Sequence, residues 1–240
     1  MNVVPAAITR DLSPTGTLRA AINLGNPVLA RGTPAAPAGV TVDIARELGS
    51  RAGVPVELVC FDAARKSFDA VTAGRADICF LAIEPAREAE LAFTAPYVVI
   101  EGVFAVPRDS AITTTADVDR ERVRIGVKQG SAYDLFLSRT LQHASVVRGD
   151  EGTGVLCDLG LEAAAGIRQP MTEFVRSHPG FRLIEGPFMQ IRQAMATTRT
   201  RGPETIQFLR TFVEELKASG FVADALRRAD QPDVTVAPPG

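Results

Sequence analysis

Residues 68–97, FDAVTAGRADICFLAIEPAREAELAFTAPY, place a helix, a strand, a sharp turn and an arginine in succession. Within this stretch, residues 76–82 form a nearly continuous apolar run between Gly74 and Pro85, which is typical of a strand buried on both faces. Pro85 suits the first position of a helix, so a new turn is expected directly after the strand, with its N–H groups pointing back towards the strand end. Arg87 follows at that turn. Its planar guanidinium can bond both oxygens of a carboxylate, which predicts an acid-binding site there, and a surface salt bridge is the alternative.

The same stretch carries a resemblance to a known family. Residues 74–97 read G-R-A-D, then A-I-E-P-A-R, then F-T-A-P-Y, an order that is similar to the signature of the family 3 solute-binding proteins of ABC uptake systems. Glu84 stands where that family has threonine. The resemblance extends to residues 16–19, 39–45, 125–131 and the closing helix that ends at Gly220. It implies that Arg87 binds the carboxylate of the ligand.

The resemblance also implies the fold class. We expect an α/β protein with a two-lobed, periplasmic-binding-protein-like type II fold, in which each lobe is a central, mostly parallel sheet flanked by helices. Two crossing segments near residues 100–107 and 194–200 would join the lobes. Lobe 1 is then expected to comprise residues 1–103 and 198–240, and lobe 2 residues 104–197. A cleft between the lobes would close on a solute.

Residues at the ends of predicted strands are further candidates for the ligand site, because ligands bind at the carboxyl ends of strands in open α/β sheets. Asn23 lies at the end of the first predicted strand and Asn26 just after it, and each is expected either to hydrogen-bond the solute or to be a turn residue. Phe61 ends the second strand and either stacks on the solute or belongs to the core. Ala82 stands where the family often has Ser or Thr, which makes the site more apolar. Gln169 opens a helix after a later strand.

A second predicted anion-binding element lies in lobe 2. Gly130, Ser131 and Ala132 lead from a strand into a helix, with Ser131 as a ready N-cap. The N–H groups of Ser131 and Ala132 could hold an anion. The resemblance implies that this turn binds the same carboxylate as Arg87, through backbone alone at Ala132, where the family has a hydroxyl residue.

One departure from the family bears on the ligand. Residues 162–167 resemble the family strand that ends near an acidic residue, the partner of the ligand's α-ammonium in amino-acid receptors. Ile167 stands at about that position and supplies no counter-charge. A buried ammonium without a counter-charge is costly, so we expect a solute with a carboxylate and without an obligatory ammonium.

The remaining elements follow from periodicity and end signals. We expect Thr41 to cap a helix that stops at Gly53, and Pro203 to begin the last long helix. The predicted strands are residues 17–24, 54–61, 76–82, 123–127, 144–147, 181–184 and 188–196; the predicted helices are residues 41–52, 64–73, 131–142, 152–161, 168–178 and 204–219; residues 25–39 are predicted to be a loop.

Composition agrees with a globular binding protein. The chain has 240 residues, of which 46% are hydrophobic and 22% charged, and its net charge is −2. Nothing indicates a nucleic-acid surface, and no apolar window of about 18 residues indicates a membrane span. The N-terminus lacks a basic segment followed by an apolar one, so we expect a cytoplasmic protein as the chain stands, or a periplasmic one if a signal was removed.

Cysteines and histidines indicate no metal site and no cofactor. Cys60, Cys79 and Cys157 lack metal-ligand spacing and are expected to be buried, reduced thiols. His143 and His178 lie far apart near predicted helix ends and are expected at the surface.

The function expected first is reversible binding of a small organic acid, with an ABC permease as a possible partner and, by resemblance, a monomeric state. An enzyme similar to the cyclohexadienyl dehydratases is the alternative, and Glu84 or Asp134 would then be the general acid or base. Either carboxylate could instead be present for the helix dipole. A cytoplasmic small-molecule sensor is the third possibility.

Overall fold

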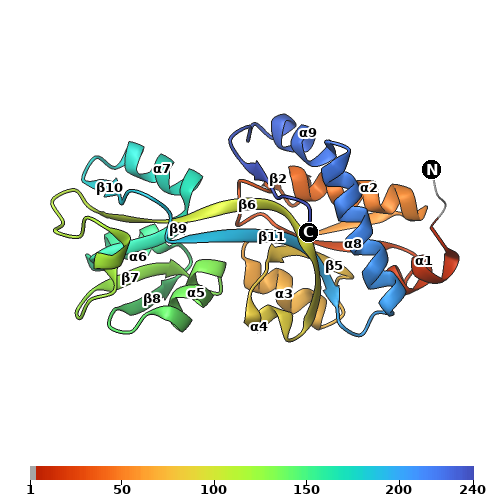
Figure 1. The fold of residues 1–240 in the computed structure, drawn as a ribbon, viewed down its shortest axis with the longest axis horizontal. Helices are drawn as coiled ribbons and strands as arrows, with labels where there is room; N and C mark the ends of the chain where they lie inside the picture. The colour runs from red at the N-terminus through yellow and green to blue at the C-terminus, as the bar shows by residue number, and fades with distance from the viewer. Residues whose placement is uncertain (1–3) are drawn as a thin grey trace. The chain divides into compact units, whose positions relative to one another are not determined.

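The computed structural model describes residues 4–240, which divide into two compact α/β units. Unit 1 holds the described residues up to Val99 together with Arg192–Gly240, and unit 2 holds Ile100–Ile191. The chain passes from one unit to the other within strand β6 (Leu91–Pro107) and returns within strand β11 (Met189–Thr198). Figure 1 shows the helices and strands of both units.

Unit 1 is built on a mixed sheet that contains three parallel strands. Its elements are α1 (Ala6–Leu12), β1 (Leu18–Asn23), β2 (Arg31–Thr33), β3 (Ala36–Ala38), α2 (Val40–Ala52), β4 (Val56–Phe61), α3 (Ala64–Thr72), β5 (Ile78–Ala82), α4 (Pro85–Glu88), the first part of β6, the last part of β11, α8 (Pro203–Ala218), α9 (Phe221–Arg228) and β12 (Thr235–Val236). The strand order is β4-β1-β5-β11-β6, with β12 paired to β6. Strands β4, β1 and β5 are parallel, and β11 runs antiparallel to β5.

Helices cover both faces of this sheet. From β1 the chain crosses through α2 to β4 on one side of β1, and then returns through α3 to β5 on the other side. Connections between parallel strands are right-handed, so two crossovers that run in opposite directions across the sheet place their helices on opposite faces. Helices α2 and α3 are therefore expected on opposite faces. Figure 1 shows α2 together with α8 and α9, and α3 together with α4. Strand β5 is therefore covered on both faces, and all five of its residues are buried.

Several predictions for unit 1 are confirmed, and two are wrong. Gly53 ends α2 in the left-handed conformation, at φ 67°, and Pro203 occupies the first turn of α8. Thr41 does not cap α2, since Gly39 holds that position and the Thr41 hydroxyl donates to the Leu29 carbonyl over 3.3 Å. The region predicted as a loop, residues 25–39, contains the two-stranded hairpin of β2 and β3.

Unit 2 has its own mixed sheet. Its elements are the last part of β6, a 3-10 turn (Thr115–Val118), β7 (Arg124–Lys128), α5 (Ala132–Thr140), β8 (Ser145–Gly149), α6 (Gly152–Leu159), β9 (Ala163–Ile167), α7 (Arg168–Ser177), β10 (Phe181–Leu183) and the first part of β11. The strand order is β6-β9-β7-β8, and β10 also pairs with β6. Strands β7, β8 and β9 are parallel, whereas β6 and β10 are antiparallel to their neighbours. Buried Leu156 of α6 and Met171 of α7 contribute to its core.

Two glycines of α6 lead to a prediction about packing. A Cβ at Gly152 would lie 2.7 Å from the Gly126 carbonyl oxygen and 3.0 Å from that of Ala165, because the helix begins directly against the sheet. A Cβ at Gly154 would meet only a Glu151 atom, at 4.0 Å. We expect Gly152→Ala to lower the free energy of unfolding by about 1–3 kcal/mol, through overpacking. Gly154→Ala should instead raise it by up to about 1 kcal/mol, through helix propensity.

Urea unfolding of both variants checks this prediction, and Gly154→Ala serves as the control on the same helix. Equal stability of the two variants would contradict the close approach of α6 to the sheet.

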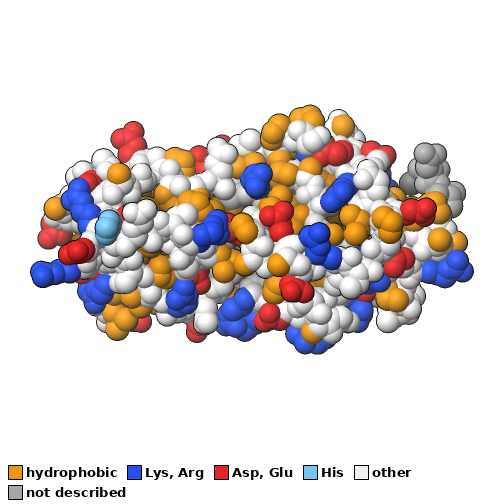
Figure 2. Space-filling model, turned by 60° about the horizontal axis from the view of Figure 1, so that its bottom comes forward, with side chains coloured by type: hydrophobic (Ala, Val, Ile, Leu, Met, Phe, Trp, Pro, Cys, Tyr) orange, Lys and Arg blue, Asp and Glu red, His pale blue; other side chains and the backbone are white. Residues whose placement is uncertain are grey.

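Surface character follows the composition. On the face drawn in Figure 2, Lys and Arg side chains are interspersed with Asp and Glu, and no block of one sign stands out. His143 and His178 are exposed, as expected. Every described helix is too short or too polar to cross a membrane.

Candidate functional site

The predicted site residues of unit 1 lie at the carboxyl ends of its parallel strands. Asn23 and Phe61 are the last residues of β1 and β4 and stand opposite each other in the strand register. Ala82 ends β5, which pairs with β1 in the same direction. Since the ends of neighbouring parallel strands meet at one edge of the sheet, the structure brings these three residues to that edge. We call it the carboxyl edge of unit 1.

Arg87 reaches the carboxyl edge from α4. Helix α4 is a single turn of four residues with Pro85 in its first turn, so it is too short to offer the helix N-terminus that the sequence suggested. The Arg87 side chain is nonetheless held inside the unit, with the residue only 4% exposed. Its Nη1 donates to the Ala82 carbonyl oxygen over 3.0 Å. The guanidinium therefore lies against the end of β5.

Burial changes the electrostatics of this arginine. Loss of solvent lowers the pKa of Arg87 to about 10, and the neighbouring Cys79 and Glu84 partly oppose that shift. The guanidinium remains charged at neutral pH. Glu84, which precedes α4, is also only 4% exposed. The carboxyl edge thus holds a buried cation with a buried acid close in sequence.

The three cysteines differ in exposure. Cys79 is buried, and burial raises the pKa of its thiol to about 12, so it is a neutral thiol and a poor nucleophile. Cys60 is half-buried, whereas Cys157 is exposed, so the prediction that it is buried was wrong. All three are free thiols. Among residues 4–240, no group of three or more His, Cys, Asp and Glu side chains is arranged to hold a metal ion.

The structure separates the roles of the two candidate asparagines. Asn23 Oδ1 accepts a hydrogen bond from Gly25 N over 3.0 Å, which is the turn role left open by the sequence. Asn26 is 6% exposed, and its Oδ1 accepts no hydrogen bond from any described residue. Asn26 is therefore a buried polar side chain that the turn does not explain.

Phe61 belongs largely to the core of unit 1. It is half-buried and packs, together with Phe68 and Ile83, against a cluster of buried residues that includes Leu81 and Leu91. This is the core role that the sequence left open for it.

In unit 2, the predicted anion-binding turn is largely occupied by its own groups. Ser131 is the N-cap of α5, as predicted, and its Oγ accepts from Asp134 N over 3.1 Å. Gly130 N donates to Asp134 Oδ2 over 2.8 Å, and Ser131 N donates to the Lys128 carbonyl over 3.1 Å. The prediction that Ser131 N–H is available to an anion was therefore wrong. Ala132, which is buried, follows as the first residue of α5.

Asp134 has a structural role that the sequence did not reveal. Its carboxylate accepts hydrogen bonds from Gly130 N, from Ser138 Oγ over 3.1 Å and from Arg148 Nε over 3.0 Å. The residue is only 3% exposed. A carboxylate with both oxygens engaged in this way is poorly placed to act as a general acid or base.

Gln169 lies in the first turn of α7, directly after β9. The residue is half-buried, and its Oε1 is buried without a hydrogen-bond partner among the described residues. The preceding Arg168 is ion-paired with Glu101 and is 34% exposed at the side chain.

Unit 1 also has a pocket that was not predicted from the sequence and that none of the predicted site residues lines. It encloses about 600 Å³ and lies between α4, the start of β6 and the N-terminal half of α8. Its lining is mixed and includes Leu91, Phe93 and Ile206, with Arg199 and Arg210 among its polar side chains. Both arginines donate to backbone carbonyls, Arg199 to Glu88 and Arg210 to Phe93.

Comparison with solved structures shows the fold. A mutant of ArgBP from T. maritima matches with a TM-score of 0.75 at 20% identity, over 93% of this chain and 99% of that one. The cysteine-binding protein from Campylobacter jejuni matches with a TM-score of 0.76 at 19% identity, over 96% and 99%. The ancestral amino-acid-binding protein AncCDT-1, a precursor of cyclohexadienyl dehydratase, gives 0.73 at 18% identity, over 92% and 98%. The predicted two-lobed type II periplasmic-binding-protein-like fold is confirmed.

Sequence comparison identifies the family. No curated protein sequence matches the chain. The family model for bacterial extracellular solute-binding proteins, family 3, matches residues 18–228, which is most of the chain. The protein therefore belongs to family 3 of the bacterial extracellular solute-binding proteins.

Proposed function

We propose that the protein reversibly binds a small, carboxylate-bearing solute, and that Arg87 holds the carboxylate. The observation that carries this proposal is the burial of a charged guanidinium at the carboxyl edge of unit 1, against the Ala82 carbonyl. The planar arginine fork matches the two oxygens of a carboxylate and can bond both of them at once.

Two of the similar solved structures contain a ligand with a carboxylate. One was crystallised with lysine and the other with L-arginine. In the present chain Ile167 ends β9, at about the position where amino-acid receptors of the family place an acid for the ammonium group. We therefore propose a carboxylate as the required group and no requirement for an ammonium. An ABC permease is the proposed partner, and a monomer the proposed state.

Catalysis is the second candidate function, and buried Glu84 near Arg87 is the observation that favours it. Asp134, the other candidate acid, is engaged by Gly130, Ser138 and Arg148. Incubation with prephenate or arogenate separates the two functions. We expect neither compound to be consumed, and turnover that is lost in Glu84→Gln would favour the enzyme.

Binding is tested by two measurements on the purified chain. Native mass spectrometry reports any solute that co-purifies, and a thermal-shift screen compares small carboxylates with the matched amines and amides. A ligand at a hundredfold excess over its Kd stabilises the folded state by about 2.7 kcal/mol, which gives a measurable rise in Tm. We expect carboxylates alone to raise Tm. A screen in which amides or amines raise Tm as much as the carboxylates do would overturn the proposal.

A further inference from the structure

Asn26 has a side chain whose environment is unusual for a turn residue. It lies three residues beyond the end of β1, at the carboxyl edge of unit 1. It is 6% exposed, and its Oδ1 has no hydrogen-bond partner among the described residues. Most buried polar atoms in proteins are paired, so an unpaired one requires an explanation.

Backbone geometry does not explain the choice of asparagine. Among the described non-glycine residues, only Arg122 and Asp230 have positive φ, so Asn26 does not adopt the left-handed conformation that favours asparagine. The side-chain bond that closes this turn comes from Asn23, whose Oδ1 accepts from Gly25 N. The Asn26 backbone carbonyl accepts from Leu29 N and Ala30 N over 3.1 and 3.0 Å, and these bonds would form with any side chain.

The unpaired Asn26 oxygen makes the ligand-free protein less stable than an apolar side chain at this position would. A buried amide oxygen that has left water and gained no donor destabilises the folded state. An apolar side chain of the same shape would not carry that cost. Groups that destabilise the fold in this way are characteristic of functional sites, where the missing partner arrives with the ligand.

The position of Asn26 connects this oxygen with the solute site. Strands β1 and β5 are parallel neighbours, and Arg87 lies against the last residue of β5. Asn26 and Arg87 therefore both follow strand ends at the same edge of one sheet. In unit 2, Gln169 follows the end of β9 and likewise has a buried Oε1 without a partner among the described residues.

We propose that Asn26 Oδ1 accepts a hydrogen bond from the bound solute, which therefore carries an N–H or O–H donor in addition to its carboxylate. This inference rests on the proposed function. A neutral amide oxygen can accept from a hydroxyl, an amide or an ammonium. The donor requirement is thus compatible with 2-hydroxy acids as well as amino acids, and it excludes plain alkanoates.

Matched probes test the carboxylate and the donor separately. The first set is L-norleucine, hexanoate, which lacks the α-amino group, and pentylamine, which lacks the carboxylate. The second is L-cysteine, 3-mercaptopropanoate and cysteamine, and the third is 2-hydroxypropanoate, propanoate and ethanol. Isothermal titration calorimetry on the wild-type chain should show the tightest binding for the donor-bearing carboxylate of at least one set. The acid that lacks the α donor should bind about 10- to 100-fold more weakly.

Two variants complete the test. Asn26→Leu should lose that 10- to 100-fold preference while its ligand-free Tm stays equal to or above that of the wild type. Asn23→Ala is the control on the same loop, and its ligand-free Tm should fall because the Gly25 bond is lost. If Asn26→Leu fails to fold, Asn26→Ala and the wild-type probe comparison still decide the matter.

The two proposals fail in distinguishable ways. If no carboxylate binds in preference to its matched amine or alcohol, the proposed function fails and the donor requirement fails with it. If carboxylates bind but the α donor makes no difference, or if Asn26→Leu keeps the wild-type preference, only the donor requirement fails. Asn26 Oδ1 would in that case be simply hydrated.

Discussion

Replacement of Arg87 with methionine is expected to weaken binding of the carboxylate solute by about 2–4 kcal/mol, which is roughly 30- to 900-fold in Kd. Methionine keeps much of the length of the side chain and removes its charge. The bound carboxylate would then be left desolvated without its cation, and that penalty accounts for much of the loss. Calorimetry with the best carboxylate found in the screen measures the effect.

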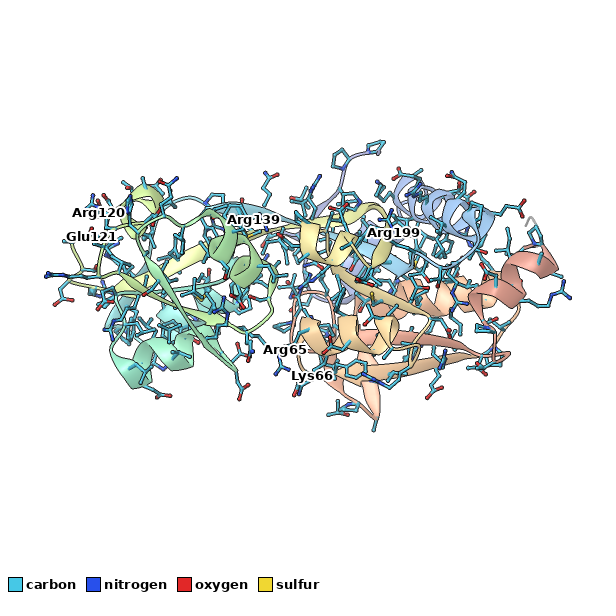
Figure 3. All side chains as sticks on the ribbon, turned by 90° about the horizontal axis from the view of Figure 1, so that it is seen from below. Arg65, Lys66, Arg120, Glu121, Arg139 and Arg199 are labelled. Atoms are coloured by element: carbon cyan, nitrogen blue, oxygen red, sulfur yellow. The ribbon has the colours of Figure 1, made fainter. Side chains whose placement is uncertain are left out.

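Arg199→Met is the matched control for this experiment. Arg199 belongs to the same unit and is exposed, and its Nη1 donates to a backbone carbonyl, that of Glu88, over 2.7 Å (Figure 3). Its replacement changes the net charge equally, and it removes the bond to the Glu88 carbonyl rather than the Arg87 bond to the Ala82 carbonyl. We expect its Kd to remain within about twofold of the wild type, since exposed charges are screened. Equal affinity of Arg87→Met and Arg199→Met would remove Arg87 from the site.

Arg87→Lys separates charge from geometry. Lysine keeps the positive charge but replaces a planar fork with a compact ammonium. An intermediate affinity, between those of the wild type and Arg87→Met, is therefore expected. Circular dichroism on each variant checks that the fold is retained.

Local signals in the sequence were sufficient for most of the secondary structure. A helix ends at Gly53 and another begins at Pro203, as predicted, because both residues act through their own backbone. Ser131 begins a helix as predicted because its hydroxyl accepts from the N–H three residues further on. The apolar run before Pro85 likewise forms a fully buried strand. These features depend only on residues that are close in the sequence, so they can be predicted from the sequence alone.

Features that depend on distant residues were not predictable in this way. Thr41 is a residue type that often caps helices, but its hydroxyl donates to the carbonyl of Leu29, in the loop before α2. In the sequence Asp134 is recognisable only as an acidic residue in the first turn of a helix. The folded unit shows that Arg148, from the next strand, donates a hydrogen bond to it. The sequence could not reveal either partner.

In the candidate site, too, the local features were predictable and the contacts between distant residues were not. The motif placed Arg87 at the end of β5, and the structure adds that the guanidinium is buried against the Ala82 carbonyl. The sequence alone does not distinguish the roles of Asn23 and Asn26, since both lie at or just beyond the end of the first strand, near Gly25. Only hydrogen-bond partners, which are a property of the folded loop, separate the turn residue from the residue with an unpaired oxygen.

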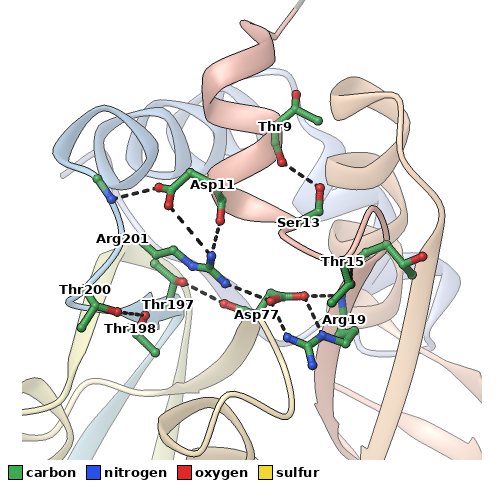
Figure 4. A network of polar contacts seen from close by, with 12 residues as sticks. Thr9, Asp11, Ser13, Thr15, Arg19, Asp77, Thr197, Thr198, Thr200 and Arg201 are labelled. Carbon is green, nitrogen blue, oxygen red and sulfur yellow. Dashed lines mark hydrogen bonds and ion pairs between the residues drawn. The ribbon is translucent and has the colours of Figure 1, made fainter.

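A buried ion network anchors the opposite end of β5 (Figure 4). Asp77, which is fully buried, accepts from Arg19 N and Arg19 Nε over 2.9 and 3.1 Å, and from Arg201 Nη2 over 2.9 Å. Arg201 also donates to the Asp11 carbonyl, and Thr197 Oγ1 donates to the Asp77 carbonyl over 2.8 Å. The carboxylate of Asp77, the residue before β5, thus links β1 with the segment after β11, and Arg201 extends the network to α1. Hydrogen bonding to Asp77 also raises the pKa of Arg19 above its ordinary value.

Asp77→Ala is expected to lower the free energy of unfolding of unit 1 by about 3–5 kcal/mol, because removing one partner of a buried ion network leaves the others uncompensated. The Arg19 and Arg201 side chains, 21% and 14% exposed, would keep their charges with little access to water. Asp224→Ala is the control in the same unit, since Asp224 and its partner Arg227 are 51% and 69% exposed. Its loss should cost less than about 1 kcal/mol.

Thermal unfolding of both variants measures the difference, with the ligand absent so that binding does not contribute to Tm. The carboxyl edge lies at the far end of β5, so a variant that still folds should bind the carboxylate within a few-fold of the wild type. Asp77→Ala would then separate stability from binding, whereas Arg87→Met alters mainly binding. A Tm for Asp77→Ala equal to that of Asp224→Ala would contradict the prediction, because it would mean that Arg19 and Arg201 regain water or other partners without cost once the carboxylate is gone.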